Sequence, residues 1–266
     1  MKFLLMLCGA AALWAAGAED ARKILSDASS HKEGNTRRDA AVALSLLPAS
    51  DPASQLLNTL ITDKDYLVRI ASIESLGEIR DLKRVELLKK ALEDEVPEVI
   101  FAAARELHDW KVPEGTEALE AIYLGEMKAK SGFMKKEWLN SVRRLKTPKS
   151  AFFFAVQRGA GFVPVPGVGA GVRAMSDILS HAELSPRAIS LLEVCQRKTP
   201  SCAEFLDMAF KDEDWTVRAS ALHVVVQQKL AKSLPAVEGL LQDKKDQVQF
   251  QAAAVYLRMQ RPARKK

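Results

Sequence analysis

Few side chains in this chain could do chemistry, and two cysteines near residue 200 are the most informative of them. Cys195 and Cys202 flank the turn Thr199-Pro200-Ser201. The residues on either side are typical of the end of one helix and the start of the next. A disulfide across this turn is therefore geometrically reasonable in an oxidising compartment, and two free thiols are the alternative. A metal site would need further ligands, and no histidine lies nearby in the sequence.

Other patterns that could bind a ligand or catalyse a reaction are incomplete. Asp63-Lys64-Asp65 and Asp212-Glu213-Asp214 lack the later ligands of a calcium loop, so helix capping explains them better. Gly167-Val168-Gly169-Ala170-Gly171 does not have the spacing of a phosphate-binding loop. The histidines are scattered, at His31, His108, His181 and His223. We therefore predict that the chain is not an enzyme and that it uses no cofactor or metal.

The helices that must position these side chains repeat at a spacing of 31 residues. Two pairs of valines stand 31 positions apart, and counting back the same distance from each pair reaches a further run of small and apolar residues with helical spacing. A repeat of this length predicts a solenoid built from helical pairs. In chain order the anchors of the repeat are Arg37, Val68, Val99, Pro186, Val217 and Val248.

Two of the repeated segments share a specific motif. Asp65-Tyr66-Leu67-Val68-Arg69 opens one and Asp214-Trp215-Thr216-Val217-Arg218 opens the other. The aspartates are placed as helix N-caps, and the valines fall on the apolar face. The motif Asp-x-x-Val-Arg-x-x-Ala resembles the HEAT-repeat family, especially its short bacterial form related to the repeats of phycobilisome lyases. The residues expected to form the repeat framework are Asp65, Val68, Arg69, Val99, Asp214, Val217, Arg218 and Val248.

The resemblance implies an all-α fold, a right-handed α-solenoid of stacked helical hairpins of the armadillo-like kind. It says little about function, because helical solenoids host many roles. One enzyme group with HEAT repeats, the deoxyhypusine hydroxylases, binds iron through His-Glu pairs. None of the four histidines of this chain is followed by Glu.

The two sets of repeats are out of phase with each other. Val99 and Pro186 are 87 residues apart, six short of three periods, so an irregular segment must lie between them. We predict a leader at 1–18, N-terminal HEAT-like repeats at 19–127, a basic and Gly/Pro-rich insertion at 128–184, and C-terminal HEAT-like repeats at 185–266.

The first 18 residues have the pattern of a secretory signal peptide. Lys2 is followed by sixteen uncharged residues, fewer than the roughly 20 that a membrane span needs. Ala16-Gly17-Ala18 then fits the small-x-small rule for cleavage before Glu19. We therefore expect an exported protein, either periplasmic in a bacterium or secreted, whose formal net charge falls from +5 to +4 when Lys2 is removed.

The insertion joins a basic helix to an apolar loop. Nine basic residues and one acid, Glu137, lie between Lys128 and Arg158. Residues 159–172 are uncharged, with five glycines and two prolines, and cannot form a long regular helix. The loop packs internally, dips into an anionic membrane beside the basic helix, or forms a partner-binding insertion. The residues of this candidate partner or membrane surface are Lys135, Lys136, Trp138, Arg143, Arg144, Phe162, Val163 and Val165.

Together these patterns predict a noncatalytic scaffold that mediates protein–protein interaction outside the cytoplasm. Its partner would be a protein or peptide gripped along the solenoid. The alternative is a peripheral membrane protein that binds anionic lipid through residues 128–172. Export argues against nucleic acid as the partner of the basic cluster.

Overall fold

The computed structural model describes residues 17–124, 184–196 and 200–260, and all of their regular secondary structure is helical. The all-α prediction is confirmed for these residues. The described helices fall into two compact units. A terminal unit combines residues 17–54 with residues 184–260, and a middle unit contains residues 55–124. The predicted insertion at 128–184 lies outside the described residues, apart from Leu184.

Along the chain, first helices, which carry the Val-Arg motif or its equivalent, alternate with second helices. The first helices are α2 (Gly34–Leu44), α4 (Tyr66–Ile79), α6 (Pro97–Asp109), α11 (Pro186–Val194), α13 (Trp215–Gln228) and α15 (Asp246–Gln260). The second helices are α3 (Leu57–Leu60), α5 (Val85–Ala91), α7 (Pro113–Leu124), α12 (Pro200–Ala209) and α14 (Leu234–Gly239). Short 3₁₀ turns at Pro52–Leu56, Leu82–Arg84, Ala231–Ser233 and Leu240–Gln242 adjoin them, and residues 17–29 are also helical.

The first helices begin where the sequence predicts. The Asp65 carboxylate accepts the backbone N–H of Leu67, and the Asp214 carboxylate accepts that of Thr216. These bonds satisfy N–H groups that a helix otherwise leaves without a partner in its first turn. The α4 and α13 helices end at Arg80 and Lys229, both in the left-handed backbone conformation.

The core follows the 31-residue period. Val68, Val99, Val217 and Val248 are all buried, as are the alanines at the centres of α6 and α15. Small residues at these positions allow neighbouring helices to approach closely. The repeat therefore places buried apolar residues at equivalent positions in both units.

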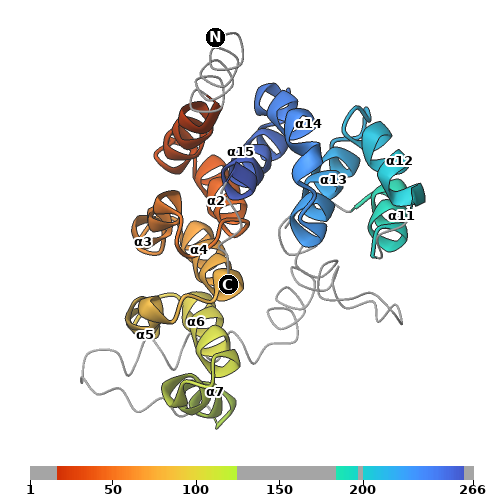
Figure 1. Cartoon of the computed structure of the whole chain (residues 1–266). Coiled ribbons are helices and arrows are strands. Elements are labelled where there is room, and N and C mark those ends of the chain that lie inside the picture. The colour runs from red at the N-terminus through yellow and green to blue at the C-terminus, as the bar shows by residue number, and fades with distance from the viewer. Residues whose placement is uncertain (1–16, 125–183, 197–199, 261–266) are drawn as a thin grey trace, which may run out of the picture. The chain divides into compact units, whose positions relative to one another are not determined.

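Within the terminal unit, the first helices follow one another in the order α11, α13, α15, α2 (Figure 1). The C-terminal repeats therefore continue into the N-terminal one. Within the middle unit, α6 packs between α4 and α7 and also contacts α5. The structure thus groups residues 17–54 with the C-terminal repeats.

Candidate partner-binding surfaces

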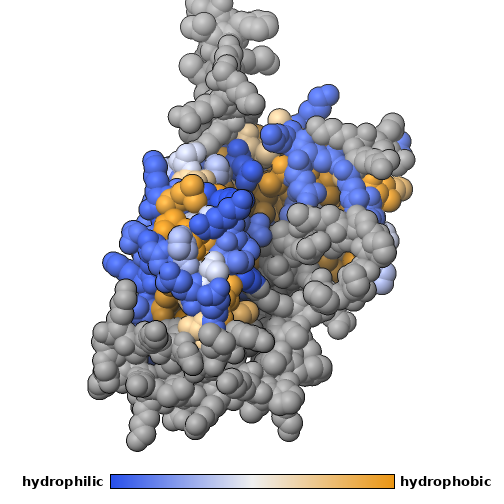
Figure 2. Space-filling view, turned by 90° about the horizontal axis from the view of Figure 1, so that it is seen from below, coloured by the Kyte–Doolittle hydropathy of each residue, from blue (hydrophilic) through white to orange (hydrophobic). Residues whose placement is uncertain are grey.

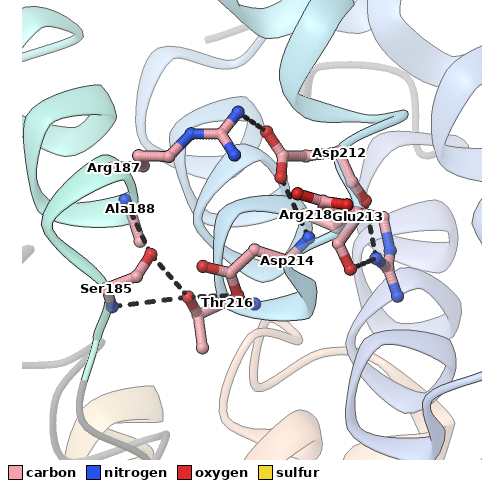
Figure 3. A network of polar contacts seen from close by, with 8 residues as sticks. All are labelled: Ser185, Arg187, Ala188, Asp212, Glu213, Asp214, Thr216 and Arg218. Atoms are coloured by element: carbon pink, nitrogen blue, oxygen red, sulfur yellow. Dashed lines mark hydrogen bonds and ion pairs between the residues drawn. The ribbon is translucent and has the colours of Figure 1, made fainter.

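Adjacent repeats are linked by arginine–aspartate pairs, and the two pairs made by Arg69 and Arg218 are largely buried. In the terminal unit, Arg218 binds both carboxylate oxygens of Asp243 through Nε at 2.6 Å and Nη2 at 2.7 Å. Its Nη1 donates to the carbonyls of Asp212 and Glu213 at the end of the preceding repeat (Figure 3). The Arg218 side chain therefore connects α13 to the turn that precedes it and to the turn that precedes α15. The bidentate geometry is the strong form of this ion pair.

The same arrangement recurs at the same spacing in the middle unit. Arg69 donates to the Asp63 carbonyl and, 25 positions ahead, to the Asp94 carboxylate at 2.8 Å. Arg187 pairs with Asp212 across the same interval in the terminal unit (Figure 3). Charged pairs therefore recur at equivalent positions of the repeats, as the buried apolar residues do.

The aspartates that precede α4 and α13 also cap backbone turns. Asp63 and Asp212 each accept the N–H of the residue two positions later, which is the aspartate that caps the following helix. This accounts for Asp63-Lys64-Asp65 and Asp212-Glu213-Asp214, and it confirms capping as their role. Among the described residues, no three His, Cys, Asp or Glu side chains converge as a metal site requires.

The hydrogen bonds correct one alignment made from spacing alone. Counting back 31 positions from Val68 paired it with Arg37. In the structure Arg37 donates to the carbonyls of His31 and Lys32, six and five positions earlier, as Arg69 does to Asp63 and Lys64. Arg37 is therefore the equivalent of Arg69. The interval is 32 residues at this step, because one extra residue lies between the two repeats.

At the junction of α15 and α2 a different set of contacts replaces the arginine–aspartate pair. Gln249 occupies the arginine position of α15 and donates to the Leu241 carbonyl. The helices are joined instead by Gln247 and Asp39, whose Nε2 and Oδ2 atoms lie 2.8 Å apart, and by Arg258, which donates to the Leu46 carbonyl. Burial raises the pKa of Asp39, while Arg38 and the Gln247 hydrogen bond oppose that rise.

Cys195 and Cys202 are joined by a disulfide in the structure. It links the end of α11 to α12, and both cysteines are buried. The side chain of Gln228 in α13 donates to the Cys195 carbonyl. The disulfide therefore constrains the α11–α12 hairpin, and the Gln228 hydrogen bond connects this hairpin to α13.

A row of acidic and apolar side chains, the acidic stripe, lies on one face of α4 and α6. On each helix the stripe occupies positions i, i+3, i+7 and i+11, which share a helix face. All eight side chains are partly or fully exposed. The stripe consists of Leu67, Ile70, Glu74 and Glu78 on α4 and of Glu98, Phe101, Arg105 and Asp109 on α6.

Arg105 of the stripe lies between two carboxylates, one on α4 and one on α6. Its guanidinium contacts Glu106 directly and approaches Glu74 to 3.8 Å. Glu106 lies over Gly77, where a side chain would collide with its carboxylate. Burial raises the pKa of Glu74 to about 7, and Arg105 opposes the rise. Burial likewise raises the pKa of Glu106 to about 7. Both carboxylates share the guanidinium of Arg105.

A second surface, the end groove, lies on the α11–α12 hairpin. It has a volume of about 370 Å³ and is bordered by α11, α12 and the start of α13. Its apolar lining includes Leu191, Val194, Phe205 and Met208, with Arg187 and Asp212 at the polar side. Figure 2 shows hydrophobic surface over this hairpin at the right-hand edge of the view.

The surface predicted from the insertion falls outside the described residues. This applies to Lys135, Lys136, Trp138, Arg143, Arg144, Phe162, Val163 and Val165. Sequence reasoning missed the acidic stripe, although a signal was present. Its members stand one position before, and two, six and ten positions after, Val68 and Val99.

The stacked helical hairpins define an α-solenoid, a class that offers extended faces for protein contact. The family model of HEAT repeats matches residues 53–126. The resemblance to HEAT repeats seen in the sequence motif is therefore confirmed over these residues. No curated protein matches the chain.

Proposed function

We propose that this chain is an exported, noncatalytic scaffold that binds a protein partner through the acidic stripe of α4 and α6. The HEAT-repeat architecture supports a role in protein interaction. The stripe is the observation that carries the proposal, because it places apolar side chains beside several carboxylates on adjacent, rigidly packed helices.

The chemistry of the stripe selects the kind of partner. Ile70 and Phe101 supply apolar contact at equivalent positions of neighbouring helices. Around them, the stripe contains four carboxylates and a single arginine, Arg105. A partner segment with apolar residues on one side and lysine or arginine beside them would be complementary to both features. We therefore expect a basic amphipathic segment of another protein.

Export is supported by two features of the sequence and structure. Residues 1–18 carry the pattern of a signal peptide. The disulfide between Cys195 and Cys202 suits an oxidising compartment outside the cytoplasm. None of the described helices is both long enough and apolar enough to cross a membrane.

Affinity capture with matched variants tests the proposal. The mature chain, residues 19–266, is immobilised, exposed to cell-envelope extract of its source organism and crosslinked. Phe101→Glu should reduce recovery of the specific partner about tenfold, as expected for loss of a central apolar contact. Leu82→Glu is the control, since Leu82 is exposed but lies outside the stripe. Equal recovery by both variants would refute the proposal, and so would capture that depends on a metal or nucleotide.

The membrane alternative rests on the basic and apolar composition of residues 128–172. Co-sedimentation with vesicles of anionic and neutral lipid separates it from the scaffold proposal. Peripheral membrane binding predicts that the mature chain pellets with anionic vesicles, and that replacing residues 159–172 by a short linker abolishes this. A chain that stays in the supernatant in both forms contradicts the alternative.

A further inference from the structure

The end groove has the properties of a helix-stacking face that the described chain leaves uncovered. Val194 of α11 is 40% exposed. The residues at the same repeat position, Val225 and Tyr256 in the terminal unit and Leu76 and Leu107 in the middle unit, are fully buried. A position that is buried in four repeats and open in the fifth indicates a neighbour that would cover it.

Other residues of the same hairpin show the same difference. Ile189 is 41% exposed, whereas its equivalents Ser220 and Gln251 are buried. On α12, Met208 is 61% exposed and stands where α14 has Gly239, beside which the space is open. The hairpin thus presents large apolar groups where its neighbour has small or buried ones.

The repeat position of Arg187 indicates where the covering segment should end. Arg37, Arg69 and Arg218 are buried, and each donates to the carbonyls six and five positions earlier. Arg187 holds the same repeat position but its side chain is 65% exposed. The corresponding carbonyls would belong to residues 181 and 182, which directly precede the start of α11.

The sequence before α11 contains the pattern of a second helix. Second helices carry apolar residues at positions i, i+3 and i+4, as in Leu206, Ala209 and Phe210 of the α12 repeat. The same pattern appears in Leu57-Leu60-Ile61, Leu88-Ala91-Leu92 and Val237-Leu240-Leu241. It recurs one period before α12, in Met175, Ile178 and Leu179. These three residues lie outside the described part of the chain.

We propose that residues 172–182 form an additional second helix that packs into the end groove. Three apolar side chains then face Ile189, Val194 and Met208, and the carbonyls of residues 181 and 182 accept from Arg187. The segment ends only a few residues before α11, so its reach to the groove is short. The C-terminal array therefore begins at about residue 172 rather than 185, and the end groove is an internal contact rather than a partner site.

Crosslinking between introduced cysteines tests this contact. Ile178→Cys and Ser190→Cys are combined in the mature chain, whose native cysteines remain in their disulfide. A short bismaleimide should then link the two sites within one monomer. Adding Met175→Glu should abolish the link, because it buries a charge in the contact, while Ser176→Glu should leave it intact because Ser176 is outside the apolar pattern.

Each alternative outcome overturns the proposal in a recognisable way. A crosslinked dimer would assign the groove to a second copy of the chain. A link that forms only after addition of cell extract would assign the groove to a partner. The absence of any link would mean that residues 172–182 do not pack into the groove. Hydrogen exchange of the unmodified mature chain provides a second measurement: the amides of residues 174–180 should exchange at least tenfold more slowly than in the Met175→Glu variant. Equal exchange would contradict a packed helix.

Discussion

Gln247 and Asp39, 208 positions apart in the sequence, are joined by a hydrogen bond in which Nε2 of Gln247 donates to Oδ2 of Asp39. This bond lies between α15 and α2, where the last repeat meets the first. Arg258 strengthens the same junction through the Leu46 carbonyl. The α15 and α2 helices therefore belong to one helical array, although the intervening residues 55–124 belong to the other compact unit.

The junction should show measurable coupling between its two halves. In a double-mutant cycle with Asp39→Ala and Gln247→Ala, the coupling free energy should be about 1 kcal/mol, the usual contribution of a partly buried hydrogen bond. Urea unfolding of the mature chain provides the measurement. Asn58→Ala with Gln55→Ala, an exposed hydrogen-bonded pair, is the control and should show coupling close to zero. Additive effects of the Asp39 and Gln247 substitutions on the free energy of unfolding would contradict this contact between α15 and α2.

The buried pair of Arg218 and Asp243 should be costly to break on one side only. Arg218→Met leaves the Asp243 carboxylate buried without its cation, so the free energy of unfolding should fall by about 3–5 kcal/mol. Adding Asp243→Leu should recover a large part of that loss. Calorimetry of the three variants checks this. No recovery in the double variant would mean that the carbonyl bonds of Arg218, rather than its charge pairing, hold the repeats together.

Removing the disulfide should destabilise the α11–α12 hairpin. Replacing both cysteines by alanine opens a short loop, and the loss expected from loop-closure entropy is about 2.5 kcal/mol. Denaturant unfolding under non-reducing conditions measures this loss. Wild-type protein treated with a reductant is the matched control and should lose a similar amount. A protein purified from the envelope with two free thiols would argue against both the bridge and the oxidising compartment.

The raised pKa values of Glu74 and Glu106 predict a pH dependence of stability in the middle unit. Both carboxyls have a folded pKa of about 7, above the ordinary value of 4.5. Between these pH values the folded state binds more protons than the unfolded state, so stability falls as pH rises from about 4.5 to 7. Hydrogen exchange of α4 and α6 amides at pH 5 and pH 8, corrected for intrinsic rates, measures the effect.

Glu106→Gln provides the control for this pH effect. It removes one of the two titrating carboxyls while keeping the shape of the side chain, so the difference in protection between pH 5 and pH 8 should shrink. Protection that increases with pH in the wild-type chain would show that the surroundings stabilise the charged carboxylates, and it would contradict burial as the dominant influence on their pKa values.

The sequence predicts the helical architecture well because the period leaves local signals. The Asp65 and Asp214 caps and the buried valines depend on short-range chemistry that a single segment contains. The contact between Gln247 and Asp39 depends on where two distant segments meet, and neither residue forms part of a motif. The register of Arg37 was missed for a related reason: one inserted residue shifts a spacing without disturbing the helical pattern.

The candidate site was harder to predict than the fold. Basic and apolar residues of the insertion draw attention by composition, whereas the stripe combines ordinary helix-surface residues such as Glu74 and Ile70. The proximity of Glu74 to Arg105 appears only when neighbouring repeats are aligned in space. Net composition hides this as well, because a chain with a formal charge of +5 does not suggest an acidic surface.

Site-specific photo-crosslinking tests the partner-binding role of the stripe most directly. A photoreactive phenylalanine analogue is placed at Phe101 in the acidic stripe or, as a control, at Leu82, and each mature chain is irradiated in cell-envelope extract. We expect a discrete adduct with one protein from position 101, weakened by Glu74→Lys, and no such adduct from position 82. The same adducts from both positions, or none from position 101, would contradict a partner-binding stripe.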